Sequence, residues 1–371
     1  MRILNKKTNK KMKVIISGGG TGGHIFPAVS IAEELKRRNP SVDILFVGAE
    51  NRMEMEKIPV LGYSIIGLPI QGFYRKITLK NIKTLVNVLR SVRMAKKIIR
   101  DFNPNIVIGV GGYASGPVLF AAQKMEVPTL IQEQNSYAGI TNKILAKRVK
   151  KVCVAYDDMD RFFRAETIVF TGNPIRPQIQ NIQCTKQQAY EHFALDAHKK
   201  TILLVGGSLG ARTLNQCVLS AMERIQNAGI QIIWQTGKLF YETAHEQARA
   251  FDAVHVHEFI KDMDVAYTAA DIIISRAGAG TISELCVVGK PTILVPSPNV
   301  SEDHQTKNAQ ALVVKNAAVM ISDADAPEHL FERAFELLNN EQELSLLARN
   351  CKNLAIPNAA ELIGNEIQKL M

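Results

Sequence analysis

Short runs of apolar, β-branched residues recur along the whole chain and alternate with stretches of helical periodicity. Most of these runs are apolar without interruption, as expected for strands that helices cover on both faces. The candidate strands are residues 13–17, 43–48, 106–111, 128–132, 151–156, 167–172, 201–207, 231–237, 254–260, 271–278, 291–297 and 317–321. Their alternation with helices predicts an α/β fold with parallel sheets built from strand–helix–strand units.

Each half of the chain begins with a strand that runs into a glycine-rich turn. The first turn is SGGGTGGH, residues 17–24, and the second is GGSLGAR, residues 206–212. Between the halves, TGNPIRPQ (171–178) has the glycine and proline content of a linker. The pattern predicts two doubly wound domains joined near residue 175. Because ligands bind at the carboxyl ends of strands in such sheets, we expect the two domains to face one cleft.

Length and charge agree with two domains of different character. The chain has 371 residues, more than one hydrophobic core usually supports, and 46% of them are hydrophobic. Residues 1–176 carry 29 Lys and Arg against 13 Asp and Glu, whereas residues 177–371 carry 16 against 22. The first domain is therefore expected to face an anionic partner. No apolar run is long enough to span a bilayer, and the basic extension at residues 1–11 lacks the apolar segment of a signal peptide.

Two patterns could suggest a metal site, and we interpret neither of them in that way. His255 and His257 alternate along one strand without a third ligand nearby, so a half-exposed strand face explains them better. Asp-Met-Asp occurs at 158–160 and 262–264, near helix starts, where aspartate serves as an N-cap. The five cysteines lack the spacing of a zinc site. We expect no bound metal and no cofactor.

The glycine turns are the strongest candidates for a ligand site. Gly18, Gly20 and Gly23 match the spacing of a dinucleotide-binding turn, with Glu50 as a candidate ribose acceptor. That motif explains neither His24 nor the second turn at 206–211. A third turn, GVGGYASGP (109–117), follows another strand. Three such turns indicate backbone amides arranged to bind phosphate groups, because tight strand–helix turns alone need fewer glycines.

Seven motifs occur in an order that resembles a known family. They are GGGTGGHIFPA (18–28), GGYASGP (111–117), EQNSYAGITNK (133–143), GNPIR (172–176), GGSLGARTLN (206–215), SRAGAGTISEL (275–285) and EDHQTKNA (302–309). In this order they resemble the MurG family of N-acetylglucosaminyltransferases, from about Met12 to the C-terminus. The resemblance implies the GT-B fold, which has two Rossmann-like doubly wound domains facing an interdomain cleft.

The resemblance also implies the reaction and its partners. UDP-N-acetylglucosamine donates its sugar, with inversion, to the 4-hydroxyl of the muramoyl sugar of lipid I. Lipid I is undecaprenyl-pyrophosphoryl-MurNAc-pentapeptide, and the product is lipid II for peptidoglycan synthesis. The protein would act peripherally at the cytoplasmic face of the bacterial inner membrane, on an anionic membrane surface, and would bind no nucleic acid.

The resemblance divides the chain and assigns roles to its residues. Residues 1–11 are an extension, 12–175 with the C-terminal helix 356–371 face acceptor and membrane, and 176–355 bind the UDP-sugar. His24 is implied as the general base, with the alternative that it only orients the acceptor. The implied acceptor-binding residues are Gly20, Gly111, Gly112, Tyr113 and Ser115. The implied donor-binding residues are Thr21, Gly22, Gly23, Asn135, Arg176, Ser208, Ile260, Ala279, Gly280, Thr281, Ile282, Ser283, Glu284 and Gln305.

Within the donor-binding set, individual contacts are implied. Ser208 and Arg176 would contact the diphosphate, and the Ile260 backbone would contact the uracil. Glu284 would accept hydrogen bonds from the ribose hydroxyls, and Asn135 and Gln305 would hold the sugar. Some members of the family have paired glutamines where this chain has His304-Gln305-Thr306, so the side chain that binds the sugar hydroxyls stays open.

A basic segment indicates a membrane-facing helix. Residues 57–100 contain no Asp or Glu, and residues 74–100 carry nine Lys and Arg. Apolar residues recur there at helical spacing: Leu79, Ile82, Leu85, Val86, Leu89 and Val92. Such a stripe commonly packs on a sheet, but a lipid-linked acceptor favours a split role, in which part of the segment meets the membrane. The expected membrane-facing residues are Phe73, Tyr74, Arg75, Lys76, Ile77, Lys80 and Lys83.

Other functions are compatible with parts of the sequence. A dinucleotide-dependent oxidoreductase would use residues 18–23 but would leave the second glycine turn without a role. A basic scaffold that binds membrane or nucleic acid through residues 57–100 would need no nucleotide sugar. Within the same fold, a nucleotide-sugar epimerase or a glycolipid-forming transferase is the nearest alternative.

Overall fold

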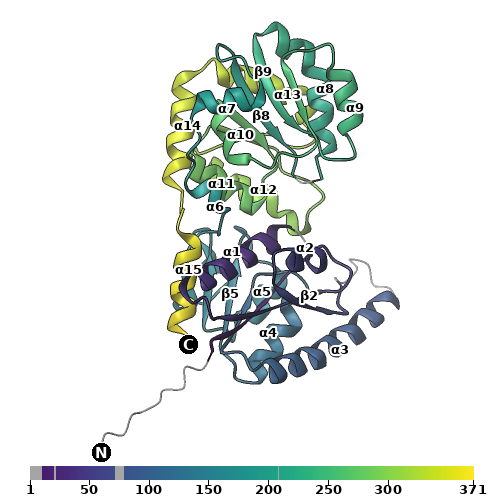
Figure 1. The fold of residues 1–371 in the computed structure, drawn as a ribbon, viewed down its shortest axis with the longest axis vertical. Helices are drawn as coiled ribbons and strands as arrows, with labels where there is room; N and C mark the ends of the chain where they lie inside the picture. Colours follow the sequence, from purple (N-terminus) through teal and green to yellow (C-terminus); the bar gives the residue numbers. More distant parts are fainter. Residues whose placement is uncertain (1–10, 21, 72–78, 208) are drawn as a thin grey trace, which may run out of the picture. The chain divides into compact units, whose positions relative to one another are not determined.

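The computed structural model describes residues 11–20, 22–71, 79–207 and 209–371. These residues form two compact units. Unit 1 consists of the described residues up to Gln134, Ala138–Pro174 and Asn358–Met371. Unit 2 consists of Asn135–Tyr137 and Ile175–Pro357. The chain therefore enters unit 2 briefly at residues 135–137, returns to unit 1, and forms most of unit 2 from residue 175 onward. It ends in unit 1 with its last helix (Figure 1).

Unit 1 contains a seven-stranded parallel sheet with the order β3-β2-β1-β4-β5-β6-β7 among the described residues. Its strands are β1 (Lys13–Ser17), β2 (Asp43–Ala49), β3 (Ser64–Leu68), β4 (Ile106–Gly109), β5 (Thr129–Glu133), β6 (Lys151–Val154) and β7 (Ile168–Phe170). Its helices are α1 (Gly22–Arg38), α2 (Glu54–Val60), α3 (Leu79–Phe102), α4 (Ser115–Lys124), α5 (Ile140–Leu145) and α15 (Ala359–Lys369), with 3₁₀ turns at Met159–Arg161 and Ala165–Thr167. The strand order reverses between β1 and β4, which is where ligands bind in open α/β sheets.

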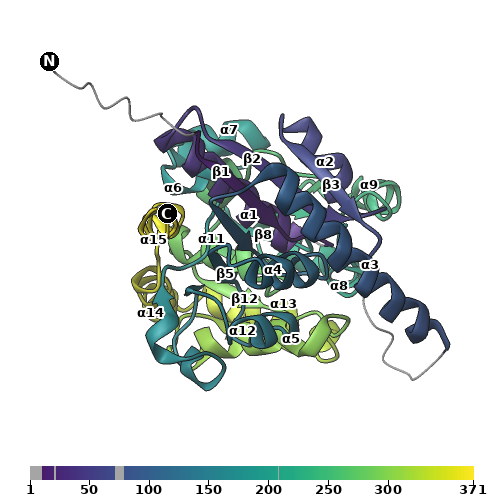
Figure 2. The ribbon, with the colours of Figure 1, turned by 90° about the horizontal axis from the view of Figure 1, so that it is seen from below.

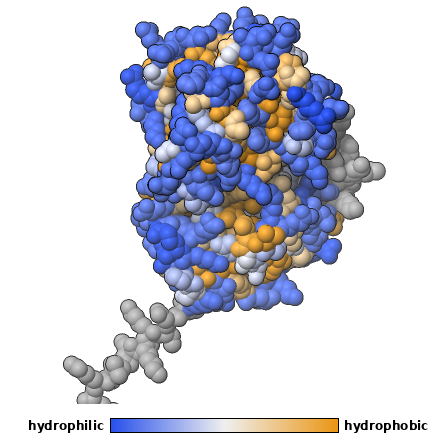
Figure 3. Space-filling model, turned by 45° about the horizontal axis from the view of Figure 1, so that its top comes forward, coloured by the Kyte–Doolittle hydropathy of each residue, from blue (hydrophilic) through white to orange (hydrophobic). Residues whose placement is uncertain are grey.

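Both faces of this sheet are covered by apolar packing. Val14 and Ile16 of β1 pack in one buried cluster with residues of α1 and α15, whereas Ile15 packs in another with residues of α3 and α4. The helices α3 and α4 run side by side (Figure 2). Alternate residues of one strand thus enter different clusters, which explains why the strands are apolar at every position. On the face drawn in Figure 3, hydrophilic residues cover most of the surface and hydrophobic residues form smaller groups.

Unit 2 contains a six-stranded parallel sheet with the order β10-β9-β8-β11-β12-β13 among the described residues. Its strands are β8 (Lys200–Val205), β9 (Ile230–Gln235), β10 (Val254–His257), β11 (Ile272–Ser275), β12 (Thr292–Leu294) and β13 (Val319–Met320). Its helices are α6 (Pro177–Gln180), α7 (Lys186–Phe193), α8 (Arg212–Asn227), α9 (Tyr241–Ala248), α10 (Met263–Ala269), α11 (Ala279–Val288), α12 (His304–Val313), α13 (Ala326–Leu338) and α14 (Glu341–Asn353), with a 3₁₀ turn at Ser301–Asp303. The order reverses between β8 and β11.

The predicted fold class and all twelve predicted strands are confirmed, and one strand was missed. The missed strand, β3, lies at the sheet edge and pairs only with β2 among the described residues. Its side chains alternate in exposure, and Gly67 interrupts its apolar residues. An edge strand of this kind lacks the continuous apolar run that marks a central strand.

The last helix, α15, is tied to unit 1 by Arg38 at the end of α1. The Arg38 guanidinium donates hydrogen bonds to Asn365 Oδ1 (2.7 Å), Gln368 Oε1 (3.0 Å) and the Glu361 carbonyl (2.7 Å). A Cβ at Gly364 would lie 2.9 Å from Arg38 Cζ, so the glycine lets the guanidinium reach the α15 backbone. Because a guanidinium presents several donors in one plane, a single side chain can hold three acceptors.

We therefore expect Arg38→Ala to loosen α15 while the rest of unit 1 stays folded. Losing these charge-assisted bonds should speed amide hydrogen exchange in α15 roughly tenfold or more. The matched control is Arg37→Ala, because Arg37 is exposed and its side chain bonds to Glu34 of its own helix. Equal α15 exchange in the two variants would contradict this role of Arg38.

Candidate functional site

Two glycine turns meet at the point in unit 1 where the strand order reverses. One follows β1 at Gly18–Gly20, and the other follows β4 at Gly111 and Gly112. A Cβ at Gly112 would lie 2.3 Å from the Gly19 carbonyl oxygen, and Gly112 has a φ of +82°. A Cβ at Gly18 would lie 2.9 Å from the Gly111 carbonyl oxygen and 2.2 Å from the Val110 side chain. The glycines are thus required because the two turns pack backbone against backbone.

His24 lies on the first turn of α1 and contacts both glycine turns. Its Nδ1 lies 3.0 Å from the Gly19 carbonyl oxygen. A carbonyl oxygen only accepts hydrogen bonds, so Nδ1 carries the proton, and in the neutral ring Nε2 is the basic nitrogen. A Cβ at Gly111 would lie 2.9 Å from Nε2, which places this nitrogen against the second turn.

The structure brings most of the predicted acceptor-side residues together. Gly20 follows β1 in the first turn. Of the residues predicted to bind the donor, Gly22 and Gly23 also lie in unit 1, at the start of α1, and Thr21 lies outside the described residues. Buried Ser115 opens α4 and donates a hydrogen bond from Oγ to the Gly112 carbonyl (2.9 Å). Tyr113 is 48% exposed, so its ring is accessible beside the second turn.

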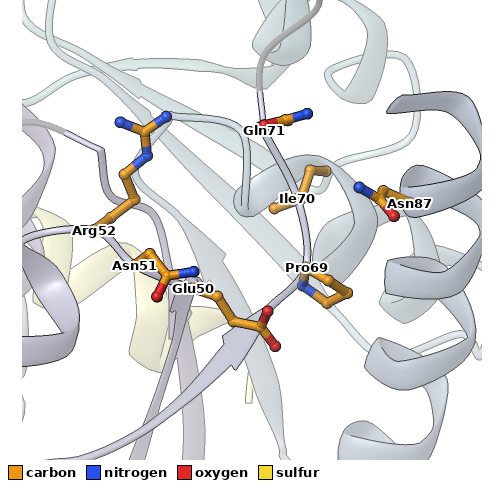
Figure 4. A pocket seen from close by; sticks show the side chains of 7 residues that line it. All are labelled: Glu50, Asn51, Arg52, Pro69, Ile70, Gln71 and Asn87. Atoms are coloured by element: carbon orange, nitrogen blue, oxygen red, sulfur yellow. The ribbon is translucent and has the colours of Figure 1, made fainter. Parts of the chain in front are cut away.

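A pocket of about 380 Å³ lies in unit 1, at the carboxyl ends of β2 and β3 (Figure 4). Its lining residues are Glu50, Asn51, Arg52, Pro69, Ile70, Gln71 and Asn87. One cation, one carboxylate and three amides give it the means to bind a polar, charged group. Glu50, which the oxidoreductase hypothesis assigned to a ribose, forms part of this wall.

In unit 2, the glycine turn after β8 is built in a similar way. A Cβ at Gly210 would lie 1.9 Å from the Thr236 carbonyl oxygen, and Gly210 has a φ of +76°. Buried Gln235, which the sequence did not indicate, donates to the Gly207 carbonyl (3.0 Å) and accepts from the Ile260 N–H (2.9 Å). Ile260 therefore has only its carbonyl to offer a ligand. Ser208 lies outside the described residues.

Arg176 and Glu284, both predicted to bind the donor, form a bidentate ion pair. Arg176 Nε lies 2.6 Å from Glu284 Oε1, and Nη2 lies 2.5 Å from Oε2. Burial lowers the pKa of the Arg176 guanidinium, but the hydrogen bonds to Glu284 outweigh this and hold the pKa above its ordinary value. The hydroxyl of buried Tyr267 donates to Glu284 Oε2 (3.4 Å), and burial raises the pKa of this phenol. Glu284 is thus fixed from two sides.

Glu284 belongs to the first turns of α11, where the other predicted donor residues follow one another. Ala279 and Ile282 are buried, Thr281 and Ser283 are half-buried, and Ser283 Oγ donates to the Ala279 carbonyl (3.0 Å). A Cβ at Gly280 would meet nothing within 4 Å, so a ligand has room there. The N-terminal amides of a ten-residue helix favour an anion.

Buried Asn308 on α12 organises the predicted sugar-side residues, and the sequence did not single it out. Its Nδ2 donates to Asn135 Oδ1 (3.1 Å), and its Oδ1 accepts from the Ser136 N–H (2.9 Å). These contacts explain why residues 135–137 belong to unit 2. Gln305 accepts from the Ser297 N–H (2.9 Å) and so fixes the loop after β12.

The predicted helix caps need a correction. Asp158 and Asp262 do occupy N-cap positions, but neither side chain accepts a capping hydrogen bond.

Burial lowers the pKa of both His255 and His257, and the His257 ring packs edge-on against Phe193. No group of three or more His, Cys, Asp or Glu suited to a metal ion occurs among the described residues.

The basic helix α3 turns a different face inward from the one that its apolar stripe suggested. The stripe residues Leu85, Val86 and Leu89 are 54%, 58% and 55% exposed. Among the described side chains of α3, those of Thr84, Ser91, Ala95 and Ile99 are buried. Phe73, Tyr74, Arg75, Lys76 and Ile77 lie outside the described residues, as do the side chains of Lys80 and Lys83. In the described part of the chain, no helix is both long and apolar enough to cross a membrane.

Comparison with known proteins assigns these features to a family. Residues 14–154 match the glycosyltransferase family 28 N-terminal domain, and residues 201–363 match its C-terminal domain. This chain belongs to glycosyltransferase family 28. It is 55% identical to the UDP-N-acetylglucosamine–N-acetylmuramyl-(pentapeptide) pyrophosphoryl-undecaprenol N-acetylglucosamine transferase of Phocaeicola vulgatus, over 97% of each chain. It is 30% identical to Acinetobacter baumannii MurG, whose crystal structure superposes with a TM-score of 0.79 and covers 96% of this chain and 99% of that one.

Membership of glycosyltransferase family 28 decides between the alternative enzyme classes. The chain is a glycosyltransferase with the GT-B fold, and the oxidoreductase and scaffold hypotheses are wrong. The UDP-GlcNAc 2-epimerase of Neisseria meningitidis superposes with a TM-score of 0.64, covering 96% of this chain and 100% of that one, at 15% identity. At that identity the likeness shows a shared fold and no shared reaction.

The ion pair of Arg176 and Glu284 makes a testable contribution to the stability of this family 28 protein. We expect Glu284→Ala to lower the free energy of unfolding by roughly 1–3 kcal/mol, because it leaves the guanidinium and the Tyr267 hydroxyl without their shared acceptor. The effect is measured by urea denaturation of Glu284→Ala and of wild type. The control is Glu328→Ala, which truncates a carboxylate that is 84% exposed. Indistinguishable midpoints would show that the pair contributes nothing.

Proposed function

We propose that this glycosyltransferase moves N-acetylglucosamine from UDP-N-acetylglucosamine to the 4-hydroxyl of the muramyl sugar of undecaprenyl-pyrophosphoryl-linked muramyl pentapeptide. The anomeric carbon inverts, and the product serves peptidoglycan synthesis. The observation that carries the proposal is the 55% identity, over 97% of both chains, with a transferase whose name states this donor and acceptor. The relationship spans both units, so it includes both groups of candidate residues.

We assign the nucleotide of the donor to unit 2, and Thr21, Gly22 and Gly23 of unit 1 to the side of the transferred sugar. A carboxylate oxygen can accept more than one hydrogen bond, so Glu284 can keep Arg176 and also accept from a ribose hydroxyl. Arg176 then acts in two ways: it orients Glu284 and adds positive charge for the diphosphate. The N–H at N3 of uracil is a donor, and the Ile260 carbonyl is a suitable acceptor because the Ile260 N–H is already bonded to Gln235.

The amides around the unit 2 turns complete the donor site. The N-terminus of α11 and the glycine turn before α8, which includes Ser208, supply N–H groups for the diphosphate. Asn135 and Gln305 are assigned to the sugar. Asn308 positions Asn135 through the hydrogen bond to its amide oxygen.

We assign the acceptor to unit 1, with His24 as the general base. The acceptor oxygen forms a bond to the anomeric carbon while the bond from that carbon to the UDP oxygen breaks, and UDP leaves with the electron pair. The hydroxyl proton passes to His24 Nε2, because Nδ1 is held in its protonated form by the Gly19 carbonyl. The glycine turns let the acceptor approach this nitrogen without meeting side chains.

This mechanism predicts different behaviour for two substitutions of His24. His24→Ala and His24→Gln should both lower kcat roughly 10²–10⁴-fold, because base catalysis contributes about that much and neither residue can take the proton. UDP-N-acetylglucosamine affinity, measured by calorimetry, should stay unchanged in both, since unit 2 binds the nucleotide and His24 is not among the donor-binding residues. Release of UDP in the presence of a short-chain lipid acceptor reports kcat.

The kcat of His24→Gln distinguishes a general base from a residue that only orients the acceptor. A kcat of His24→Gln within a few-fold of wild type would contradict the base, because glutamine can still form hydrogen bonds. His198→Ala, at an exposed histidine of unit 2, is the control and should leave kcat unchanged.

We infer further that α3 rests on the anionic surface of the cytoplasmic leaflet of the inner membrane, which makes the protein peripheral. At 3.6 residues per turn, the exposed Leu85, Val86 and Leu89 share one face of α3 with a set of exposed cations. The cations are Arg90, Arg93, Lys96, Lys97 and Arg100. Apolar side chains beside a row of positive charge are typical of a helix that lies in a membrane interface.

The cationic half of this face can be tested apart from the apolar half. A triple variant, Arg90→Glu, Arg93→Glu and Lys97→Glu, should weaken binding to phosphatidylglycerol vesicles roughly 100-fold or more at low salt, since each cation contributes about 1 kcal/mol. Vesicle co-sedimentation measures it. The matched control, Lys147→Glu, Arg148→Glu and Lys150→Glu, makes the same charge change at exposed positions of unit 1. Equal loss in both triples would mean that net charge, and not α3, drives binding.

A further inference from the structure

A buried carboxylate lies behind the first glycine turn. Glu54, the first residue of α2, is only 1% exposed. Its Oε1 accepts a hydrogen bond from the Ala49 N–H at the end of β2 (3.1 Å), and its Oε2 accepts from the Gly20 N–H (2.9 Å). Both donors are neutral backbone amides, so the negative charge is held by peptide dipoles.

The surrounding backbone is shaped around this side chain. A Cβ at Gly19 would lie 2.1 Å from Glu54 Oε1, and Gly19 has a φ of +149°. A Cβ at Gly48 would lie 2.6 Å from Glu54 Cγ. Gly19 and Gly48 therefore both leave space that the Glu54 side chain fills. A side chain at either position would displace the carboxylate.

The carboxylate reaches His24 through a single peptide group. The Gly20 N–H, which donates to Glu54, and the Gly19 carbonyl, which accepts from His24 Nδ1, belong to the same peptide unit. Glu54, this peptide and the imidazole thus form one continuous chain of hydrogen bonds. A carboxylate at one end polarises the peptide and strengthens the acceptor at the other end, by about 10–30% per bond in condensed-phase estimates.

We propose that Glu54 is a positioning residue that orients His24 through the Gly19–Gly20 peptide. It keeps the Gly19 carbonyl directed at Nδ1, fixes the tautomer in which Nε2 is unprotonated, and stabilises the imidazolium that forms when Nε2 takes a proton. An aspartate or glutamate bonded directly to a histidine does the same in other enzymes; here a peptide group is interposed. The proposal rests on the role of His24 in the proposed function, but its first readout does not.

The first experiment observes the imidazole of His24 by ¹⁵N NMR in the full-length protein, at a pH above the range in which it titrates. Wild type should show a protonated Nδ1 and an unprotonated Nε2. In Glu54→Gln, which keeps the side-chain volume but removes the charge and places an amide NH₂ against one of the two donors, the signals should shift toward a mixture of tautomers. Glu56→Gln, on the exposed side of the same helix, should leave them as in wild type.

The second experiment measures transfer kinetics. Glu54→Gln should lower kcat roughly 10–100-fold, the usual effect of removing a group that orients a functional imidazole, while UDP-N-acetylglucosamine affinity stays unchanged. If Glu54→Gln does not fold, Glu54→Asp, which keeps the charge but withdraws it by one methylene, is expected to shift the same NMR signals. Wild-type tautomer signals in a folded variant, or a kcat within twofold of wild type, would overturn the proposal. An inactive wild-type protein would instead overturn the proposed function and leave the NMR result standing.

Discussion

The site in each unit depends on a contact between two backbones that leaves no room for a Cβ atom. In unit 1 the contact joins Gly112 to the Gly19 carbonyl, and in unit 2 it joins Gly210 to the Thr236 carbonyl. Each contact lies where a strand of the parallel sheet ends and its backbone turns toward the next helix. Any side chain at these positions would separate the turns, so the glycines determine how closely the amides and carbonyls of neighbouring strand ends approach one another. In unit 1 this approach brings the Gly19 carbonyl and Gly111 to opposite sides of the His24 ring.

The buried charged groups of both units have partners. Arg176 and Glu284 form an ion pair in unit 2, and Glu54 accepts hydrogen bonds from two backbone amides in unit 1. A buried charge without such partners would be strongly destabilising. The same partners fix the orientation of each group before any ligand binds, so little reorganisation is needed when charge develops during transfer. Stability and preorganisation thus come from the same contacts.

The sequence predicts the parts of this arrangement that follow from periodicity and from motifs. Continuous apolar runs identify the buried strands, while the edge strand β3, with Gly67 and alternating exposure, escapes that signal. Helical spacing identifies α3 but not its inward face, because Thr84 and Ser91 are buried while Leu85 and Leu89 are exposed. The choice between these faces depends on the neighbouring helix and sheet, which a local pattern does not contain.

The supporting residues of the site could not be predicted for the same reason. Glu54, Gln235 and Asn308 stand outside the glycine turns, and a Glu, a Gln or an Asn in a helix or at a strand end is usually exposed. Their roles arise from contacts with residues distant in the sequence, such as Asn308 with Asn135. A local signal does exist for Glu54: it follows a strand that ends in Gly48-Ala49, and the small residue leaves room for a buried carboxylate.

The proposed reaction is an inverting transfer that needs both units. The structure of the product formed from UDP-N-acetylglucosamine and the lipid-linked muramyl pentapeptide, determined by NMR, tests it. We expect a disaccharide on the same lipid, with a β linkage to the 4-hydroxyl and one UDP released per linkage. A disaccharide with retained α configuration, or conversion of the nucleotide sugar to its 2-epimer without any transfer, would contradict it.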